Sequence, residues 1–70
     1  MIEALTSRGW YQFHKCTCGG TLSIKFKHPS KPGIIFKIKP NKNTWQYLVN
    51  NRVTAQGVGI ETLKTKLDEV

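Results

Sequence analysis

The stretch SIKFKHPSKPGIIFKIKP, residues 23–40, carries the clearest structural signal in this chain. Apolar residues and lysines alternate on both sides of a segment rich in proline and glycine, which is typical of two β-strands joined by a loop. If the loop spans residues 29–33, Phe26 lies opposite Phe36 and the large apolar side chains share one face. The other face of this hairpin then carries four lysines: Lys25, Lys27, Lys37 and Lys39.

In this register Lys25 lies directly opposite Lys37. Like charges at such positions destabilise a β-ladder by about a few tenths of a kcal/mol, unless an anion lies over them. A stripe of one charge sign on a flat face, with an aromatic side chain nearby, is typical of surfaces that follow a phosphate backbone. The alternative is a solvated lysine face that keeps the sheet soluble and protects its edge.

The composition sets limits on the class of protein. The chain has 70 residues, and 11 Lys and Arg against 4 Asp and Glu give a formal net charge of +7. Seventy residues suffice for one small domain, which we assign to residues 1–70. The positive charge favours polyanionic partners such as nucleic acid. We find no bilayer-spanning segment and no secretory signal pattern, so we expect a cytoplasmic protein with no membrane partner.

Turn signals divide the rest of the chain into short strands. The breaks between the apolar segments are rich in glycine, proline and asparagine, which are the residues that turns require. With the central hairpin included, five candidate strands result: residues 10–16, 21–28, 34–39, 44–49 and 53–58.

Both ends of the chain show the spacing of a helix. In residues 59–70 the apolar side chains recur every three or four positions, which is typical of one face of a helix. Residues 2–7 predict a short helix closed by Gly9. We therefore expect an α+β fold: a small, mostly antiparallel, twisted sheet of about five strands with a C-terminal helix packed on one face.

The Gly-Gly pair at residues 19–20 suits a two-residue hairpin turn. With this turn Phe13 lies opposite Phe26, so an apolar row Phe13–Phe26–Phe36 forms the floor for the C-terminal helix. The same register assigns further residues to the lysine-bearing face: Trp10, Gln12, His14 and Cys16.

The last two strands allow two registers. A two-residue turn at residues 50–51 suits asparagine, and it puts Trp45 and Tyr47 on one face with Arg52 as a stacking platform for bases. A three-residue loop instead places Tyr47 and Val49 in the core. Because agreement of apolar faces usually outweighs turn preference, we prefer the core interpretation for these two residues and leave Trp45 open.

The motif HKCTCGG, residues 14–20, is the segment with metal-ligand chemistry. His14, Cys16 and Cys18 alternate along one strand and point the same way. The Cys-x-Cys spacing differs from that of zinc knuckles, and the register keeps His28 away from Cys18. Two cysteines make no disulfide framework, so we expect thiols or metal ligands in a reducing compartment. We prefer the interpretation of small residues at a tight turn, and predict no metal site and no cofactor.

The sequence contains no arrangement that predicts catalysis. A nucleophilic cysteine needs an oriented base, and nothing in the sequence orients His14 beside Cys16. Neither histidine alone argues for general base catalysis. We therefore predict that the protein is not an enzyme.

Two segments carry resemblances to known families. The order of short helix, strands and helix, with KFKHPSKPG (residues 25–33) and LKTKL (residues 63–67), resembles the HicA-type toxins, which cleave mRNA and have a double-stranded-RNA-binding-like fold. The tail at residues 55–67 is similar to the last helix of double-stranded-RNA-binding domains. The first resemblance implies ribonuclease activity. The family's catalytic histidine follows a Gly-Ser at the start of a strand, where this chain has Gly-Thr-Leu at residues 20–22 and no histidine.

We therefore predict a non-enzymatic protein that binds DNA or RNA largely without regard to base sequence. The lysines would contact phosphates, and Trp10, with Trp45 and Arg52, would stack on bases. The predicted site consists of Lys25, Lys27, Lys37, Lys39, Trp10, Lys15, Lys31 and Arg52. The alternatives are a protein-interaction or assembly module, with a homodimer formed through an exposed sheet edge, and a toxin-like ribonuclease.

Overall fold

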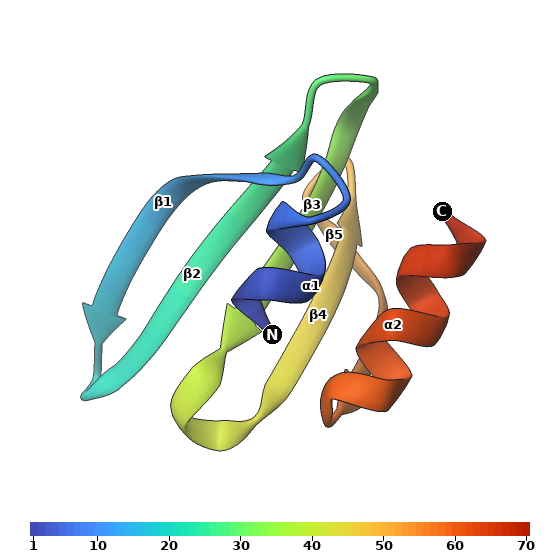
Figure 1. The fold of residues 1–70 in the computed structure, drawn as a ribbon. Coiled ribbons are helices and arrows are strands. Elements are labelled where there is room, and N and C mark those ends of the chain that lie inside the picture. The colour runs from blue at the N-terminus through green and yellow to red at the C-terminus, as the bar shows by residue number, and fades with distance from the viewer.

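The structure is a computed structural model that describes residues 1–70 apart from the Cys18 side chain. Five strands form one antiparallel sheet in chain order and two helices accompany it, which confirms the predicted α+β fold (Figure 1). The elements are α1 (Ile2–Thr6), β1 (Tyr11–Cys18), β2 (Thr21–His28), β3 (Lys31–Lys39), the 3-10 turn η1 (Pro40–Lys42), β4 (Thr44–Val49), β5 (Arg52–Val58) and α2 (Ile60–Glu69).

Both helices lie on the same side of the sheet (Figure 1). Leu5 of α1 and Leu63 of α2 belong to one buried cluster with Phe26 and Phe36 of the sheet. We call this side the helix-bearing face. Alternate strand residues point to the opposite side. We call that side the open face, because no helix or strand of the described residues packs on it.

The central hairpin has the predicted register over its regular part. Phe26 lies opposite Phe36, and Lys25 lies opposite Lys37. The connection is shorter than expected, because the ladder shifts after Lys27 and His28 pairs with Lys31, so β3 already begins there. Apart from Ile35, the apolar residues of this regular part therefore lie on the helix-bearing face and the lysines on the open face, as the alternation in the sequence predicts.

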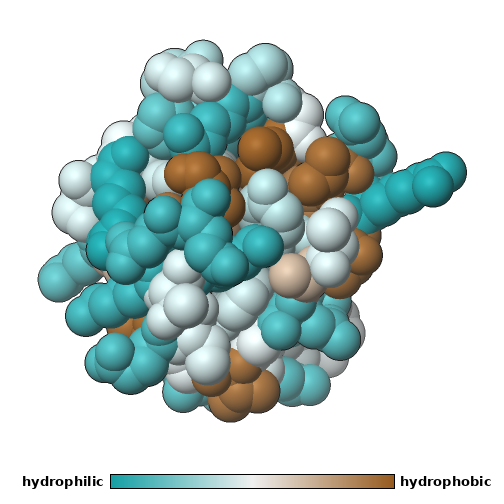
Figure 2. Space-filling model, turned by 90° about the vertical axis from the view of Figure 1, so that its right-hand side faces the viewer, coloured by the Kyte–Doolittle hydropathy of each residue, from teal (hydrophilic) through white to brown (hydrophobic). Residues whose placement is uncertain are grey.

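Phe36 lies at the centre of the core and is fully buried. Its ring centroid is 4.9 Å from that of Trp10 and 5.2 Å from that of Tyr47, and both ring pairs are steeply inclined. Leu67 adds to the cluster from α2. Full burial of a phenylalanine side chain such as Phe36 stabilises the fold by about 1.5–3 kcal/mol. The side of the molecule on which α2 lies is mostly hydrophilic at its surface, with separate hydrophobic areas (Figure 2).

A β-bulge at Phe13 corrects the predicted register of β1. Gln12 lies opposite Phe26 and His14 opposite Lys25, so Phe13 is the extra residue. The bulge reverses the alternation before it, and Trp10 turns to the helix-bearing face, where it is 4% exposed. The predicted row Phe13–Phe26–Phe36 was therefore wrong at Phe13, and the predicted places of Gln12 and Trp10 on the lysine-bearing face were also wrong. The physical reason is that the bulge buries the large indole ring.

The turn between β4 and β5 combines the two registers that the sequence allowed. Asn50 and Asn51 have φ angles of 52° and 68°, as a two-residue turn with both central residues left-handed requires. A bulge at Thr54 then shifts the ladder, so that Tyr47 lies opposite Ala55. The two-residue turn and the predicted core position of Tyr47 are both satisfied, because one extra residue separates them. Val49 is half-buried opposite Arg52 and does not belong to the core cluster, so the core prediction was wrong for this residue.

Trp45, which the sequence left open, belongs to the core. It is 4% exposed, and its indole Nε1 donates a hydrogen bond of 2.9 Å to Thr62 Oγ1 of α2. Its ring lies over Gly57, where a Cβ atom would come within 2.7 Å of Trp45 Cζ2. The glycine in β5 thus makes room for the ring that attaches α2 to the sheet.

Candidate functional site

Four lysines of β2 and β3 point to the open face, as the sequence predicts. Lys25 lies directly opposite Lys37, and Lys27 lies opposite Ile35 at the next position of that face. Lys25, Lys37 and Lys39 are half-buried, so their aliphatic stems lie along the sheet while their amines reach solvent. We call this set the lysine strip: Lys25, Lys27, Lys37 and Lys39.

The negative charges of the chain lie elsewhere. Of the described residues, all four carboxylate side chains belong to helices, and Asp68 lies 3.5 Å from Arg8 across the helix-bearing side. The strands carry lysines and an arginine but no acid. The carboxylates are Glu3, Glu61, Asp68 and Glu69. The lysine strip is therefore a surface of one charge sign, and such a surface attracts anions.

Two shallow hollows adjoin the lysine strip and share Lys37 and Lys39. One, of about 380 Å³, extends over β1 and β2 to His14. The other, of about 300 Å³, extends over β4 and β5, where Gln46 Nε2 donates a 3.3 Å hydrogen bond to Gln56 Oε1. Together they form a path across the strands with the cations in its middle.

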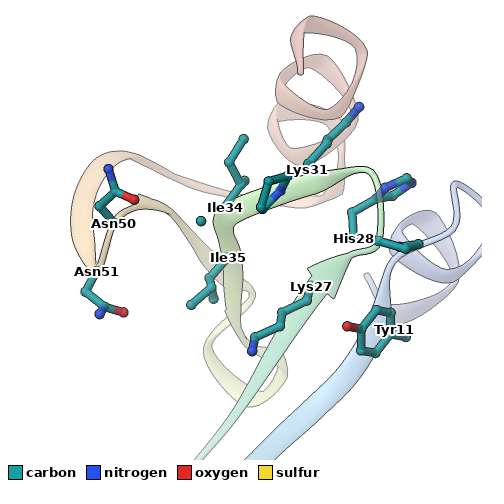
Figure 3. Close-up of a pocket in the computed structure, with 11 residues that line it drawn as sticks. Tyr11, Lys27, His28, Lys31, Ile34, Ile35, Asn50 and Asn51 are labelled. Atoms are coloured by element: carbon teal, nitrogen blue, oxygen red, sulfur yellow. The ribbon is translucent and has the colours of Figure 1, made fainter.

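One end of the open face is aromatic. Tyr11 and Phe13 are 49% and 39% exposed, and the Lys27 Nζ lies 4.3 Å from the centroid of the Phe13 ring. Figure 3 shows Tyr11, Lys27 and Ile35 on one side of the strands, with Lys31 on the other. These two aromatic residues were missed by the sequence analysis. Trp10 carried a signal that could have revealed them. The register without a bulge leaves this indole, the largest apolar side chain of its strand, in solvent. A bulge in β1 removes that conflict by turning Trp10 inward.

Three of the other predicted site residues do not lie on the open face. Trp10 is buried, so the prediction that it stacks on bases was wrong. Lys15 lies opposite Ile24, and Arg52 lies opposite Val49, which puts both on the helix-bearing face. Arg52 is at the exposed start of β5, whereas Trp45 is covered by α2.

Lys31 also lies apart from the lysine strip. It pairs with His28 at the end of the β2–β3 hairpin, and it lines a hollow at that end of the sheet. The structure therefore brings together the four lysines of the strip and leaves the other predicted residues outside it.

The two histidines lie on opposite faces of the sheet. His14 is exposed beside Lys25 on the open face. His28 lies on the helix-bearing face, where its Nδ1 accepts a 3.1 Å hydrogen bond from the Ser30 N–H. Its Nε2 lies 3.1 Å from the Arg8 carbonyl oxygen, so this nitrogen carries the proton and donates it. His28 therefore ties the α1–β1 loop to β2, and it forms no acid–base pair with His14.

Cys16 corrects one expectation about the HKCTCGG motif. It is disulfide-bonded in the structure, so the prediction of a thiol or metal ligand was wrong for this residue. The same prediction for Cys18 falls outside the described side chains. Within the described residues, no group of three His, Cys, Asp or Glu side chains is placed to hold a metal ion.

No family model, no curated protein and no solved structure matches the chain. Across the described residues, none of the helices has both the length and the apolar character needed to cross a membrane.

Proposed function

We propose that this protein binds nucleic acid without catalysis, through contacts between the lysine strip and backbone phosphates. The observation that carries the proposal is the separation of charge: the strip has four cations on one face of the sheet, and every described carboxylate side chain lies on a helix. Phosphate contacts fix the position of a nucleic acid but do not read its sequence. Recognition through the strip is therefore largely independent of base sequence.

The Lys25–Lys37 pair supports an anionic ligand. Two like charges directly across a ladder lower stability by about a few tenths of a kcal/mol, and a bound phosphate removes this repulsion. The adjoining hollows give a polyanion a path over both sides of Lys37 and Lys39. A chain of phosphates fits this arrangement better than a single small anion, because the cations extend along two strands.

Salt dependence is the direct test of this proposal. Each phosphate contact contributes about 0.7 to 0.9 to the slope of log affinity against log salt, so four contacts give a slope of about −3 to −4. We would titrate labelled single- and double-stranded DNA and RNA by fluorescence anisotropy at several salt concentrations. A slope near zero would contradict the proposal.

A matched pair of variants locates the contacts. Lys25→Gln with Lys37→Gln removes two charges from the lysine strip. Lys15→Gln with Lys64→Gln removes two exposed charges from the other side of the molecule. Loss of two contacts should reduce the magnitude of the slope by about two in the first variant, and the second should keep it. Equal losses in both variants would show that net charge alone attracts the nucleic acid.

The open face also has a feature that favours the second candidate function, an assembly module. Val53 and Val58 are 51% and 66% exposed, and Leu48 and Ile35 lie beside Val53 in one row of that face. A homodimer formed through this row would leave the lysines as solubilising groups. Light scattering at two salt concentrations separates the two functions, because a dimer held by apolar contacts keeps its mass when salt is raised.

A further inference from the structure

We propose that Tyr11 and Phe13 form a stacking site for nucleobases, and that the protein therefore prefers single-stranded nucleic acid to duplex. This inference rests on the proposed function and names its substrate class. Tyr11 and Phe13 lie beside Lys27, at the end of the lysine strip. Stacking on aromatic side chains beside a basic groove is how many proteins hold single strands.

The β1 bulge creates this site. Without an extra residue, Phe13 would point into the core opposite Phe26, and Tyr11 would point the same way. With the bulge, Tyr11 lies opposite Lys27 and Phe13 contacts the Lys27 amine, so both rings stand on the open face. Exposure of 49% and 39% for two aromatic rings leaves apolar ring surface in water, and a stacked base would cover that surface.

A hollow beside the Tyr11 ring, the one that Lys31 also lines, is large enough for a base. It has a volume of about 500 Å³, and its lining includes Tyr11, Lys27, Ile35 and the amide side chain of Asn51 (Figure 3). The ring and the isoleucine offer apolar contact, and the amide offers a donor and an acceptor for a base edge. Binding sites commonly combine an apolar lining with a few polar groups in this way.

The Lys27 contact does not block the stack. An exposed cation–π contact is weaker than a stack between a base and an aromatic ring. The flexible lysine side chain therefore turns from Phe13 to a phosphate when a nucleotide binds. A strand lies about 5 Å from its neighbour, so a base on β1 has its phosphate close to the cations of β2.

A duplex cannot use the rings. Its bases are paired and stacked on one another, and side chains that approach a regular duplex reach only base edges and backbone. The bases of a single strand are free to leave their neighbours and stack on protein rings. Aromatic exposure next to the lysine strip thus favours single strands, and the phosphates supply the attraction common to both forms.

The test compares two single-stranded ligands that carry the same phosphates. One is a labelled thymidine dodecamer, and the other is a dodecamer of abasic sugar-phosphate units with no bases. We expect the protein to bind the thymidine ligand about tenfold more tightly at the same salt concentration, because base stacking is lost in the abasic ligand. This comparison uses the unchanged protein and depends on no variant.

Variants then assign the preference to the rings. Phe13→Leu and Tyr11→Leu keep an apolar side chain and remove the aromatic ring, and each should lower the preference for bases several-fold. Ile2→Ala removes exposed apolar surface on α1, away from the open face, and should leave the preference unchanged. Circular dichroism checks that each variant folds.

The outcomes separate the inference from the proposed function. Equal binding of both dodecamers, with the steep salt slope retained, would overturn the stacking site and leave the lysine strip in place. A base preference that survives in both ring variants would also overturn it. Binding of neither dodecamer at low salt would overturn the proposed function together with the inference, and a salt-independent dimer would then identify the open face as a protein contact.

Discussion

The helix-bearing face and the open face come from the same strands but follow different rules. On the helix-bearing face Phe26, Phe36 and Ile38 are fully buried, in one cluster with side chains of both helices. On the open face the residues between them, Lys25 and Lys37, lie opposite one another with no neutralising carboxylate among the described residues. The first face is apolar and packed, whereas the second mixes lysines with exposed aromatic and aliphatic side chains. The open face thus keeps two like charges opposite one another, an arrangement that lowers stability unless an anion lies over it.

The first prediction has the largest effect and concerns packing alone. Phe36→Ala should lower the free energy of unfolding by about 3–5 kcal/mol, because it opens a cavity among three aromatic rings. Leu48→Ala on the open face should cost about 1 kcal/mol, since this side chain is only half-buried. Urea denaturation measures both. Equal costs would mean that the two faces do not differ in packing.

The second prediction concerns the close approach of Trp45 to Gly57. Gly57→Ala places a methyl group 2.7 Å from the indole, and overpacking of this kind costs about 1–3 kcal/mol of unfolding free energy. The neighbouring Gln56→Ala, on the open face, should change the free energy by no more than about 0.5 kcal/mol. A thermal melt of each variant gives the comparison. A Gly57→Ala variant as stable as the unchanged protein would show that the ring has room to move.

The regular parts of the sheet and its two bulges differ in how far the sequence predicts them. The alternation in residues 23–40 predicts the faces of β2 and β3, because a strand repeats every two residues. The spacing of Leu63 and Leu67 predicts α2 in the same way. The bulges at Phe13 and Thr54 were not predicted, since an inserted residue leaves the local alternation intact on each side of it.

The missed bulges determine the candidate site. Whether Phe13 or Trp10 enters the core depends on which ring packs better against Phe36 and His28. These contacts join residues far apart in the sequence, so the local alternation of residues does not predict them. The lysine strip was accessible to sequence analysis because it lies in a regular ladder. The aromatic end was not, because it exists only when the ladder is interrupted.

The third prediction concerns the hydrogen bond that joins the helix-bearing face to α2. Thr62→Val removes the acceptor of the Trp45 Nε1 hydrogen bond and should lower the free energy of unfolding by about 1 kcal/mol. Thr65→Val is the matched control, because the Thr65 hydroxyl donates a hydrogen bond to the Glu61 carbonyl oxygen in its own helix. Chemical denaturation of both variants is the measurement. Equal losses would mean that the indole bond contributes nothing beyond helix propensity.

The smallest expected change in the free energy of unfolding is on the open face, and it is an increase where the other substitutions cause a decrease. Lys37→Gln removes the repulsion with Lys25 and should raise the free energy of unfolding by about a few tenths of a kcal/mol at low salt. The gain should disappear in high salt, where surface charges are screened. Lys64→Gln on α2 serves as the control and should show no such gain. A loss of stability on Lys37→Gln at low salt would contradict the view that the lysines oppose one another in the free protein.

The most direct test of the central claim, that the lysine strip is the binding surface, is to map the contact by NMR. Backbone amide shifts of the isotope-labelled protein would be recorded as a single-stranded oligonucleotide is added. The account predicts shifts in β2 and β3 at Lys25, Lys27, Lys37 and Lys39, and unchanged positions for the amides of α2. Shifts concentrated on α2, or no shifts at low salt, would contradict it.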